Sequence, residues 1–142
     1  MKDGFLKAAA FSPALRVADC TYNAQQVLAQ LQAAAQRGVK LAVFPEFCLT
    51  GYTCGDLFLQ PTLLQQAQAA LEHIRTGSHG SDLITIVGAP LLFESKLYNC
   101  AVFIQNGRFL AVVPKTYLPN YGEFYELRWF TPAPPQNDSV RI

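Results

Sequence analysis

The sequence predicts a layered α/β fold, and the order of its first segments is the main reason. An apolar run at Phe5–Phe11, an amphipathic segment at 19–37 and a second apolar run at Leu41–Phe44 read as strand, helix and strand. This alternation is typical of a sheet covered by helices. The chain has 142 residues, of which 51% are hydrophobic and 15% charged, and this fits one folded domain.

The first helix and the strand after it have clear boundaries in the sequence. Capping residues at Asp19–Asn23 precede the helix, and Gly38 ends it. Its predicted buried face has residues at helical spacing, namely Val27, Leu28, Leu31 and Ala35. The strand Leu41–Phe44 is short and apolar, and it should end at Pro45 because proline cannot donate to a sheet ladder.

The middle of the chain predicts a loop, a helix and a strand. Turn-forming residues at 51–61 indicate a loop, and a helix follows at Thr62–Arg75. The residues expected on its buried face are Leu63, Leu64, Ala67, Leu71 and Ile74. A third strand is expected at Leu83–Ala89, ending at Pro90.

A hairpin and a long aromatic loop follow. Strands at Tyr98–Gln105 and Phe109–Val113 flank an Asn-Gly pair at 106–107, which is the strongest short hairpin signal. The irregular stretch Tyr117–Phe130 is rich in aromatic residues, so we expect it to line a site. The segment Thr131–Ile142 is predicted to be a Pro-rich loop followed by the start of a strand.

Charge and cysteine content narrow the classes of function. The net charge of +1 provides no basic field for nucleic acid or an anionic membrane. We find no signal peptide and no membrane-spanning run in the sequence. The four cysteines form no Cys-x-x-Cys pair and no dense framework, which favours a reduced, cytoplasmic setting.

An acid and a base each follow a proline at the end of an apolar strand. Glu46 comes directly after Pro45, and Lys115 directly after Pro114. Open α/β sheets place their chemistry at the carboxyl ends of strands. A glutamate there can act as a general base, and a fixed ammonium can keep it ionised or stabilise an oxyanion. Each residue alone could be an ordinary strand-end charge, but the two together favour catalysis.

A nucleophile for this pair is not evident. A small buried hydrophobic role is favoured over a catalytic one for each cysteine, namely Cys20, Cys48, Cys54 and Cys100. His73 is expected in a helix and His79 in a loop, and their spacing does not indicate a metal site. The sequence also has no glycine-rich phosphate-binding loop, so no metal or cofactor is predicted in this domain.

Three motifs in order resemble the nitrilase, or carbon–nitrogen hydrolase, superfamily. They are Phe-Pro-Glu at 44–46, Leu-Thr-Gly-Tyr at 49–52 and Val-Val-Pro-Lys at 112–115. The resemblance implies a nitrilase-like α-β-β-α sandwich and a Glu–Lys–Cys triad. It extends over about residues 5–130, and its motifs together are far more specific than Phe-Pro-Glu alone.

Two longer segments resemble a narrower branch of this superfamily. Residues 41–64 and 97–130 are similar to the glutaminase domain of glutamine-dependent NAD synthetases. The distinguishing marks are the Gly-Tyr turn followed by Asp56-Leu57, and the run Lys-x-x-Leu-Pro-Asn-Tyr at 115–121. The resemblance implies hydrolysis of the side-chain amide of glutamine, with ammonia passed to a synthetase domain.

Catalytic roles follow from the resemblance by position. Glu46 would be the general base, and Lys115 the lysine that supports the tetrahedral intermediate. A second glutamate often lies near the lysine in this superfamily. Glu123, eight residues after Lys115, is the first candidate for this position, and Glu126 is the alternative.

Two tyrosines are candidates for the substrate pocket. Tyr52 and Tyr121 resemble aromatic residues that wall the glutamine pocket in this branch, and ordinary loop packing is the alternative for both.

The sequence departs from the family pattern in one respect. The family's nucleophilic cysteine follows the lysine strand, but no cysteine follows Cys100 here. We therefore expect residues 1–142 to be the N-terminal part of a glutaminase domain, without the catalytic-Cys segment and the C-terminal synthetase domain. On this interpretation the chain alone is inactive, and ATP and magnesium belong to the synthetase domain.

The resemblance also implies partners, and two other functions stay open. The expected partners are glutamine, a synthetase domain of the same polypeptide and further copies of the chain in a homo-oligomer. One alternative is a stand-alone amidase or nitrilase that acts on another small amide or nitrile. The other is a non-catalytic oligomerising module, because half a sandwich would expose apolar sheet.

Overall fold

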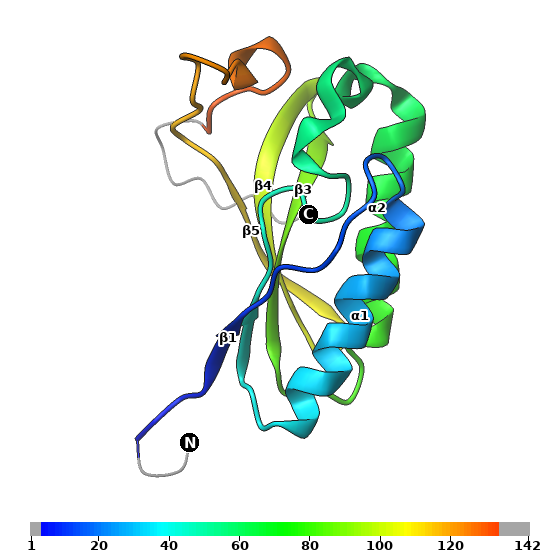
Figure 1. Cartoon of the computed structure of the whole chain (residues 1–142), viewed down its shortest axis with the longest axis vertical. Coiled ribbons are helices and arrows are strands. Elements are labelled where there is room, and N and C mark those ends of the chain that lie inside the picture. The colour runs from blue at the N-terminus through cyan, green and yellow to red at the C-terminus, as the bar shows by residue number, and fades with distance from the viewer. Residues whose placement is uncertain (1–3, 134–142) are drawn as a thin grey trace.

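The computed structural model describes residues 4–133, which form one five-stranded sheet and two long helices (Figure 1). The strands are β1 (Ala8–Ala10), β2 (Leu41–Val43), β3 (Ile84–Phe93), β4 (Lys96–Gln105) and β5 (Arg108–Pro114). The helices are α1 (Cys20–Gln36) and α2 (Pro61–Gly77), with short 3-10 helices η1 (Tyr52–Leu59) and η2 (Glu126–Arg128).

The sheet is mixed, and its strands lie in the order of the sequence. Strands β1, β2 and β3 pair in parallel, whereas β3, β4 and β5 pair antiparallel. Helices α1 and α2 make the two parallel crossovers and pack on the same side of the sheet (Figure 1). The described residues thus form one helical layer on one sheet, which is half of the expected α-β-β-α sandwich. The α/β prediction is confirmed.

Helix α1 begins and ends as its sequence predicts. The Asp19 side chain accepts a hydrogen bond from the backbone N–H of Tyr22 at 3.0 Å, which caps the first turn. Gly38 follows the last turn with φ of +71°, a conformation that glycine adopts without strain. One detail of the buried face was wrong: Ala34 is buried and Ala35 is exposed. Ala34 lies three residues after Leu31 and therefore shares its face.

The segment predicted as a loop at 51–61 is largely helical. Residues 52–59 form η1, with a kink at Gly55, and α2 then begins with Pro61 in its first turn. Proline is favoured at that position because the first N–H groups of a helix have no intrahelical partner. Hydrophobic side chains hold η1 in place, since Cys54 and Phe58 are both buried. Turn-forming residues alone could not indicate this packing.

Strand β3 continues past Pro90, so the predicted end at that residue was wrong. Pro90 pairs with Asn99 inside the antiparallel ladder. Strand β2 pairs only with residues 84–86, so β3 has a single neighbour at Pro90 and one side is free of a ladder. The chain turns back at Glu94 and Ser95, which have φ of +47° and +63°.

The hairpin predicted at 106–107 is confirmed. Strands β4 and β5 pair from Gln105 and Arg108 onwards, and Asn106 and Gly107 both have positive φ, as this tight turn requires.

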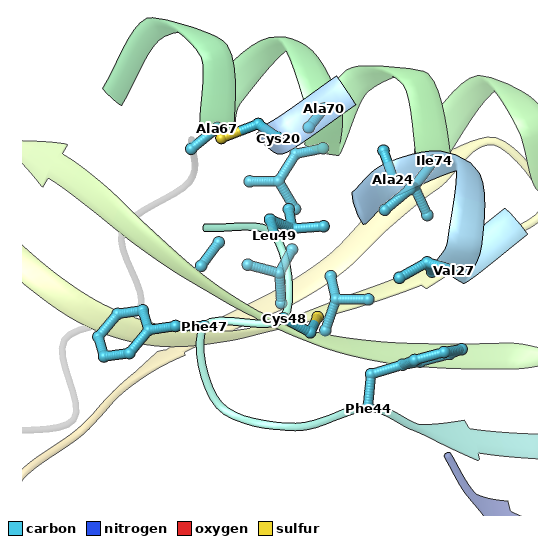
Figure 2. Packing of buried hydrophobic residues seen from close by; sticks show 14 of the residues in the cluster. Cys20, Ala24, Val27, Phe44, Phe47, Cys48, Leu49, Ala67, Ala70 and Ile74 are labelled. Atoms are coloured by element: carbon cyan, nitrogen blue, oxygen red, sulfur yellow. The ribbon is translucent and has the colours of Figure 1, made fainter. Parts of the chain in front are cut away.

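The core lies between the sheet and the two helices. Figure 2 shows Cys48 and Leu49, from the turn after β2, among side chains of α1 and α2. Both residues have no exposed surface. In contrast, several apolar side chains of β3 and β5 are exposed, namely Leu92, Phe93, Phe109, Leu110 and Val113. In residues 4–133, neither helix combines the length and apolarity needed to cross a bilayer.

Candidate functional site

Glu46 lies in a tight turn between β2 and η1. Backbone N–H groups of Cys48 and Gly51 donate to the carbonyls of Pro45 and Phe47 at 3.2 and 2.7 Å, which closes the turn. The turn packs directly on β3 at Gly88. A Cβ at Gly88 would lie 2.5 Å from the Phe47 nitrogen and 2.8 Å from the Glu46 Cα. Only glycine allows this approach, and it fixes where the Glu46 side chain starts.

Lys115 extends the antiparallel ladder by one residue beyond β5. Its backbone N–H donates to the Asn99 carbonyl at 2.7 Å. Its ammonium Nζ donates to Oε1 of Glu46 at 2.7 Å and to both carboxylate oxygens of Glu126 at 3.1 Å. The acid and base predicted from the two strand ends therefore form a direct ion pair.

The second carboxylate at the lysine is Glu126, which the sequence offered only as an alternative. Glu126 belongs to η2, is 2% exposed, and accepts a hydrogen bond from the Tyr52 hydroxyl at 2.6 Å. Glu123, the first candidate, is exposed and has no hydrogen bond or ion pair within residues 4–133. Its expected place beside Lys115 is thus taken by Glu126, because the one turn of η2 directs the later glutamate inward.

Asn99 is a member of the site that sequence reasoning missed. Its Nδ2 donates to Oε1 of Glu46 at 2.6 Å, and the residue is 4% exposed. The one available signal was a polar residue in the middle of an apolar strand, since a buried amide needs hydrogen-bond partners.

The local charges keep Lys115 and Tyr52 protonated. Burial lowers the pKa of Lys115, but hydrogen bonds to Glu46 and Glu126 outweigh this and hold the pKa above its ordinary value. Burial, followed by the hydrogen bond to Glu126, raises the pKa of the Tyr52 hydroxyl well above its ordinary value. At neutral pH the site therefore contains an ammonium and a neutral phenol that both act as donors.

A cavity of about 430 Å³ opens over these groups. Its lining residues are Glu46, Tyr52, Lys115, Pro119, Tyr121, Phe124 and Glu126. Both tyrosines predicted for a substrate pocket therefore face the same cavity as the acid–base pair. The loop 117–130, which was predicted to line a site, lines this cavity through four of its residues.

A larger hollow of about 750 Å³ lies beside Asp56, Arg128 and Trp129. Its carboxylate is already paired, because Arg128 donates to both oxygens of Asp56 at 2.7 and 2.9 Å. It therefore presents no free acid or base. We take the smaller cavity as the candidate active site, because only there do an acid, a base and polar donors converge.

None of the four cysteines lies in the candidate active site. All four are free and buried, and none lines the cavity. Burial raises the pKa of Cys48 and Cys100 to about 12, so neither is a thiolate at neutral pH. Within residues 4–133, no cluster of three or more His, Cys, Asp or Glu side chains is arranged to hold a metal ion.

The family model for the carbon-nitrogen hydrolases matches residues 7–141. The chain belongs to the carbon-nitrogen hydrolase family. In this family member, the ion pair of Glu46 and Lys115 lies within the matched region, at the positions that the Phe-Pro-Glu and Val-Val-Pro-Lys motifs predicted.

Glutamine-dependent NAD(+) synthetases are among the similar curated proteins. The one from Mycobacterium tuberculosis is 41% identical over 139 residues, which is 98% of this carbon-nitrogen hydrolase chain but 20% of that protein. The human one is 34% identical over 110 residues. The chain thus spans about a fifth of the length of the curated relatives it matches.

Solved structures with a similar fold include a glutamine-dependent NAD(+) synthetase and an amidase. A glutamine-dependent NAD(+) synthetase from Cytophaga hutchinsonii superposes with a TM-score of 0.85 at 28% identity, over 96% of this carbon-nitrogen hydrolase chain and 23% of that chain. An amidase from Nesterenkonia superposes with a TM-score of 0.78 at 21% identity, over 91% and 48%. At that identity the amidase supports the nitrilase-type fold alone.

Proposed function

We propose that this chain supplies the general base and the supporting lysine of a glutaminase site. The ammonia it releases would serve the ATP-dependent conversion of nicotinic acid adenine dinucleotide to NAD in a longer protein. The observation that carries this proposal is the 2.7 Å contact of Lys115 Nζ with Glu46 Oε1 at the wall of a cavity large enough for an amino acid. The similarity to glutamine-dependent NAD(+) synthetases supports the choice of glutamine.

The proposed reaction is nucleophilic catalysis by a cysteine thiol. Glu46 takes the thiol proton as sulfur attacks the amide carbon, and the Lys115 ammonium stabilises the developing oxyanion. The proton on Glu46 passes to the amide nitrogen, the C–N bond breaks, and ammonia leaves a thioester. Glu46 then takes a proton from water, whose oxygen attacks the thioester and releases glutamate and the thiol.

The nucleophile in this proposal comes from a segment outside these 142 residues. The cysteines of the described chain are buried and lie away from the cavity. The chain also covers only about a fifth of its relatives' length. We therefore propose that it does not hydrolyse glutamine alone, and that ATP and magnesium bind in a separate synthetase domain. Thiol-dependent ammonia release by the isolated chain would contradict this.

Glu46→Gln in the full-length protein tests the proposal. Glutamine-dependent NAD synthesis should fall by about a factor of 100 or more, because general base catalysis contributes about 10²–10⁴. Synthesis from free ammonium should be unchanged, since only the glutaminase step needs the base. Glu94→Gln, in the exposed β3–β4 turn, is the matched control. Equal loss of both activities would refute the division into two sites.

The roles of the second glutamate and the tyrosines are part of the proposal. Glu126 contacts Lys115 and Tyr52, so Glu126→Gln should lower the glutaminase rate more than Glu123→Gln. Tyr52, in η1, and Tyr121, in the aromatic loop, would both line the glutamine pocket. A larger effect of Glu123→Gln would return the second-glutamate role to Glu123.

A stand-alone amidase or nitrilase is the second candidate, because the pair of Glu46 and Lys115 would serve the hydrolysis of another small amide equally well. In that case the full-length protein would hydrolyse small aliphatic amides in preference to glutamine and would make no NAD. A non-catalytic module remains the third candidate. Exposed apolar side chains on β3 and β5 support association into a homo-oligomer in any of these cases. Four free cysteines support a reducing compartment such as the cytoplasm.

A further inference from the structure

Asn99 reaches the candidate active site through the register of the sheet. It pairs with Pro90 of β3 on one side. On the other side its carbonyl accepts from the Lys115 N–H at 2.7 Å. Residues opposite each other on neighbouring strands project from the same face, so the Asn99 and Lys115 side chains leave the sheet side by side. Both side chains end at the same atom, Oε1 of Glu46.

The two carboxylate oxygens of Glu46 therefore have different environments. Oε1 accepts from Asn99 Nδ2 at 2.6 Å and from Lys115 Nζ at 2.7 Å. Oε2 accepts no hydrogen bond from any group within residues 4–133. The Glu46 side chain is 39% exposed and lines the cavity.

We propose that Asn99 is a positioning residue that holds Oε1 of Glu46 and so leaves Oε2 as the atom that takes the proton. This inference rests on the proposed glutaminase function. In the first step the S–H bond of the nucleophile breaks and an O–H bond forms at Oε2. The sulfur electron pair forms the C–S bond, and the π pair of the C=O bond moves onto the amide oxygen as the oxyanion. Oε1 keeps both donors throughout, so the carboxyl group does not need to rotate between steps.

Lys115 alone fixes the position of Glu46 less rigidly than Asn99 does. Its ammonium is shared with Glu126 at 3.1 Å, and its side chain is 30% exposed on a flexible stem. Asn99 is 4% exposed in the middle of β4, and its short side chain has few rotamers. Asn99 is also neutral, so its hydrogen bond to Glu46 adds no charge to the site either before or after Glu46 takes the proton.

Two substitutions at Asn99 test this in the full-length protein. Asn99→Leu removes the donor at similar volume, and kcat for glutamine-dependent synthesis should fall about 10- to 100-fold with KM changed less than about twofold. Asn99→Asp is isosteric but ionised near neutral pH, so its loss should be as large at about pH 8.

Leu97→Ala is the matched control, because Leu97 is buried two residues earlier on the same strand, has no polar side-chain atom to bond Glu46 and does not line the cavity. It should lower stability and leave kcat per folded molecule unchanged. Ammonium-dependent synthesis should be unchanged in every variant. Full kcat in a folded Asn99→Leu or Asn99→Asp protein would overturn the proposal.

A readout that does not depend on activity separates this inference from the glutaminase proposal. In the 142-residue chain with ¹³C-labelled glutamate, Asn99→Leu should shift the Glu46 carboxyl resonance, whereas Leu97→Ala should not. If the full-length protein has no glutaminase activity, the proposed function fails and this resonance alone decides whether Asn99 holds Glu46. An unchanged resonance would overturn the positioning role.

Discussion

Two ion-pair clusters tie distant segments of this chain together, and they differ in burial. In the first, Lys115 lies between Glu46 and Glu126, and the Glu126 side chain is 3% exposed. In the second, Arg128 forms an ion pair with Asp56, and the two side chains are 56% and 61% exposed. Both clusters hold the aromatic loop 117–130 to the turn region that follows β2.

The difference in burial gives the two ion-pair clusters different effects on stability. Water screens the Asp56–Arg128 pair, so it contributes little to stability and acts as a clamp that orients the loop. In the Lys115 cluster the Glu126 carboxylate is shielded from water, so it depends strongly on the Lys115 ammonium. The clamp can therefore be lost with modest harm, whereas removal of Lys115 leaves the Glu126 carboxylate buried without a counter-charge.

The largest expected effect follows from removing the shared cation. Lys115→Met leaves Glu126 buried without a counter-charge, and this should lower the free energy of unfolding by about 3–5 kcal/mol. Urea denaturation followed by circular dichroism measures it. Adding Glu126→Gln should restore most of the loss. Lys40→Met, which breaks an exposed pair with Asp82, is the control and should cost less than about 1 kcal/mol. If Lys115→Met and Lys40→Met lowered the free energy of unfolding equally, burial of the Lys115 partner Glu126 would not explain the difference between the pairs.

A smaller loss should come from displacing the turn that presents Glu46. Gly88→Ala places a Cβ 2.5 Å from the Phe47 nitrogen, and this backbone contact cannot relax as a side chain can. We expect a loss of about 1–3 kcal/mol by urea denaturation. Gly77→Ala is the matched control, because its Cβ would meet only the flexible end of Leu28. A harmless Gly88→Ala would show that the close approach does not fix the turn.

Breaking the exposed clamp should have a smaller effect that depends on salt. Trp129, the chain's single tryptophan, donates through Nε1 to Asp56 at 2.9 Å and so reports on the clamp. Asp56→Asn should change Trp129 fluorescence while lowering stability less than Lys115→Met does, and the loss should shrink at high salt.

Protonation of Asp56 in acid should have the same effect on Trp129 fluorescence as Asp56→Asn, because both remove the charge of this carboxylate. Hydrogen bonds from Arg128 and Trp129 hold the pKa of Asp56 well below its ordinary 3.8. The contribution of the clamp is therefore complete above about pH 4 and is lost as the pH falls below that value. An acid fluorescence transition of equal size in Asp56→Asn would contradict the assignment.

The smallest effect near neutral pH concerns the buried thiols. Burial raises the pKa of Cys20 to about 11 and that of Cys48 and Cys100 to about 12, from 9.0. Because the folded values are higher, the thiols contribute stability in full below pH 9 and lose it as the pH rises through 11–12. Iodoacetamide should modify them at pH 8 only after unfolding. Rapid labelling of the folded chain would contradict this.

The sequence predicted the elements that depend on local pattern. Helical spacing identified α1 and α2, and the Asn-Gly turn identified the β4–β5 hairpin. The acid–base pair was also predictable, since Glu46 and Lys115 each follow a proline at a strand end.

What the sequence could not predict depends on contacts between distant segments. Pro90 stays in a strand because β2 ends before reaching it. Asn99 meets Glu46 across 53 residues, and nothing in its neighbours in sequence indicates this. The choice of Glu126 over Glu123 depends on one turn of 3-10 helix, and Phe130, two residues after that turn, packs on the distant Phe47 and Phe58.

The positions of the site residues along the chain also affect when the site can form during synthesis by the ribosome. Glu46, Asn99, Lys115 and Glu126 all lie within residues 46–126 and all belong to one sheet and its loops. Because domains begin to fold from the N-terminus during translation, these four groups can come together once residues 46–126 have left the ribosome. Newly made chains would then carry the ion pair of Glu46 and Lys115 as soon as this part of the sheet has folded.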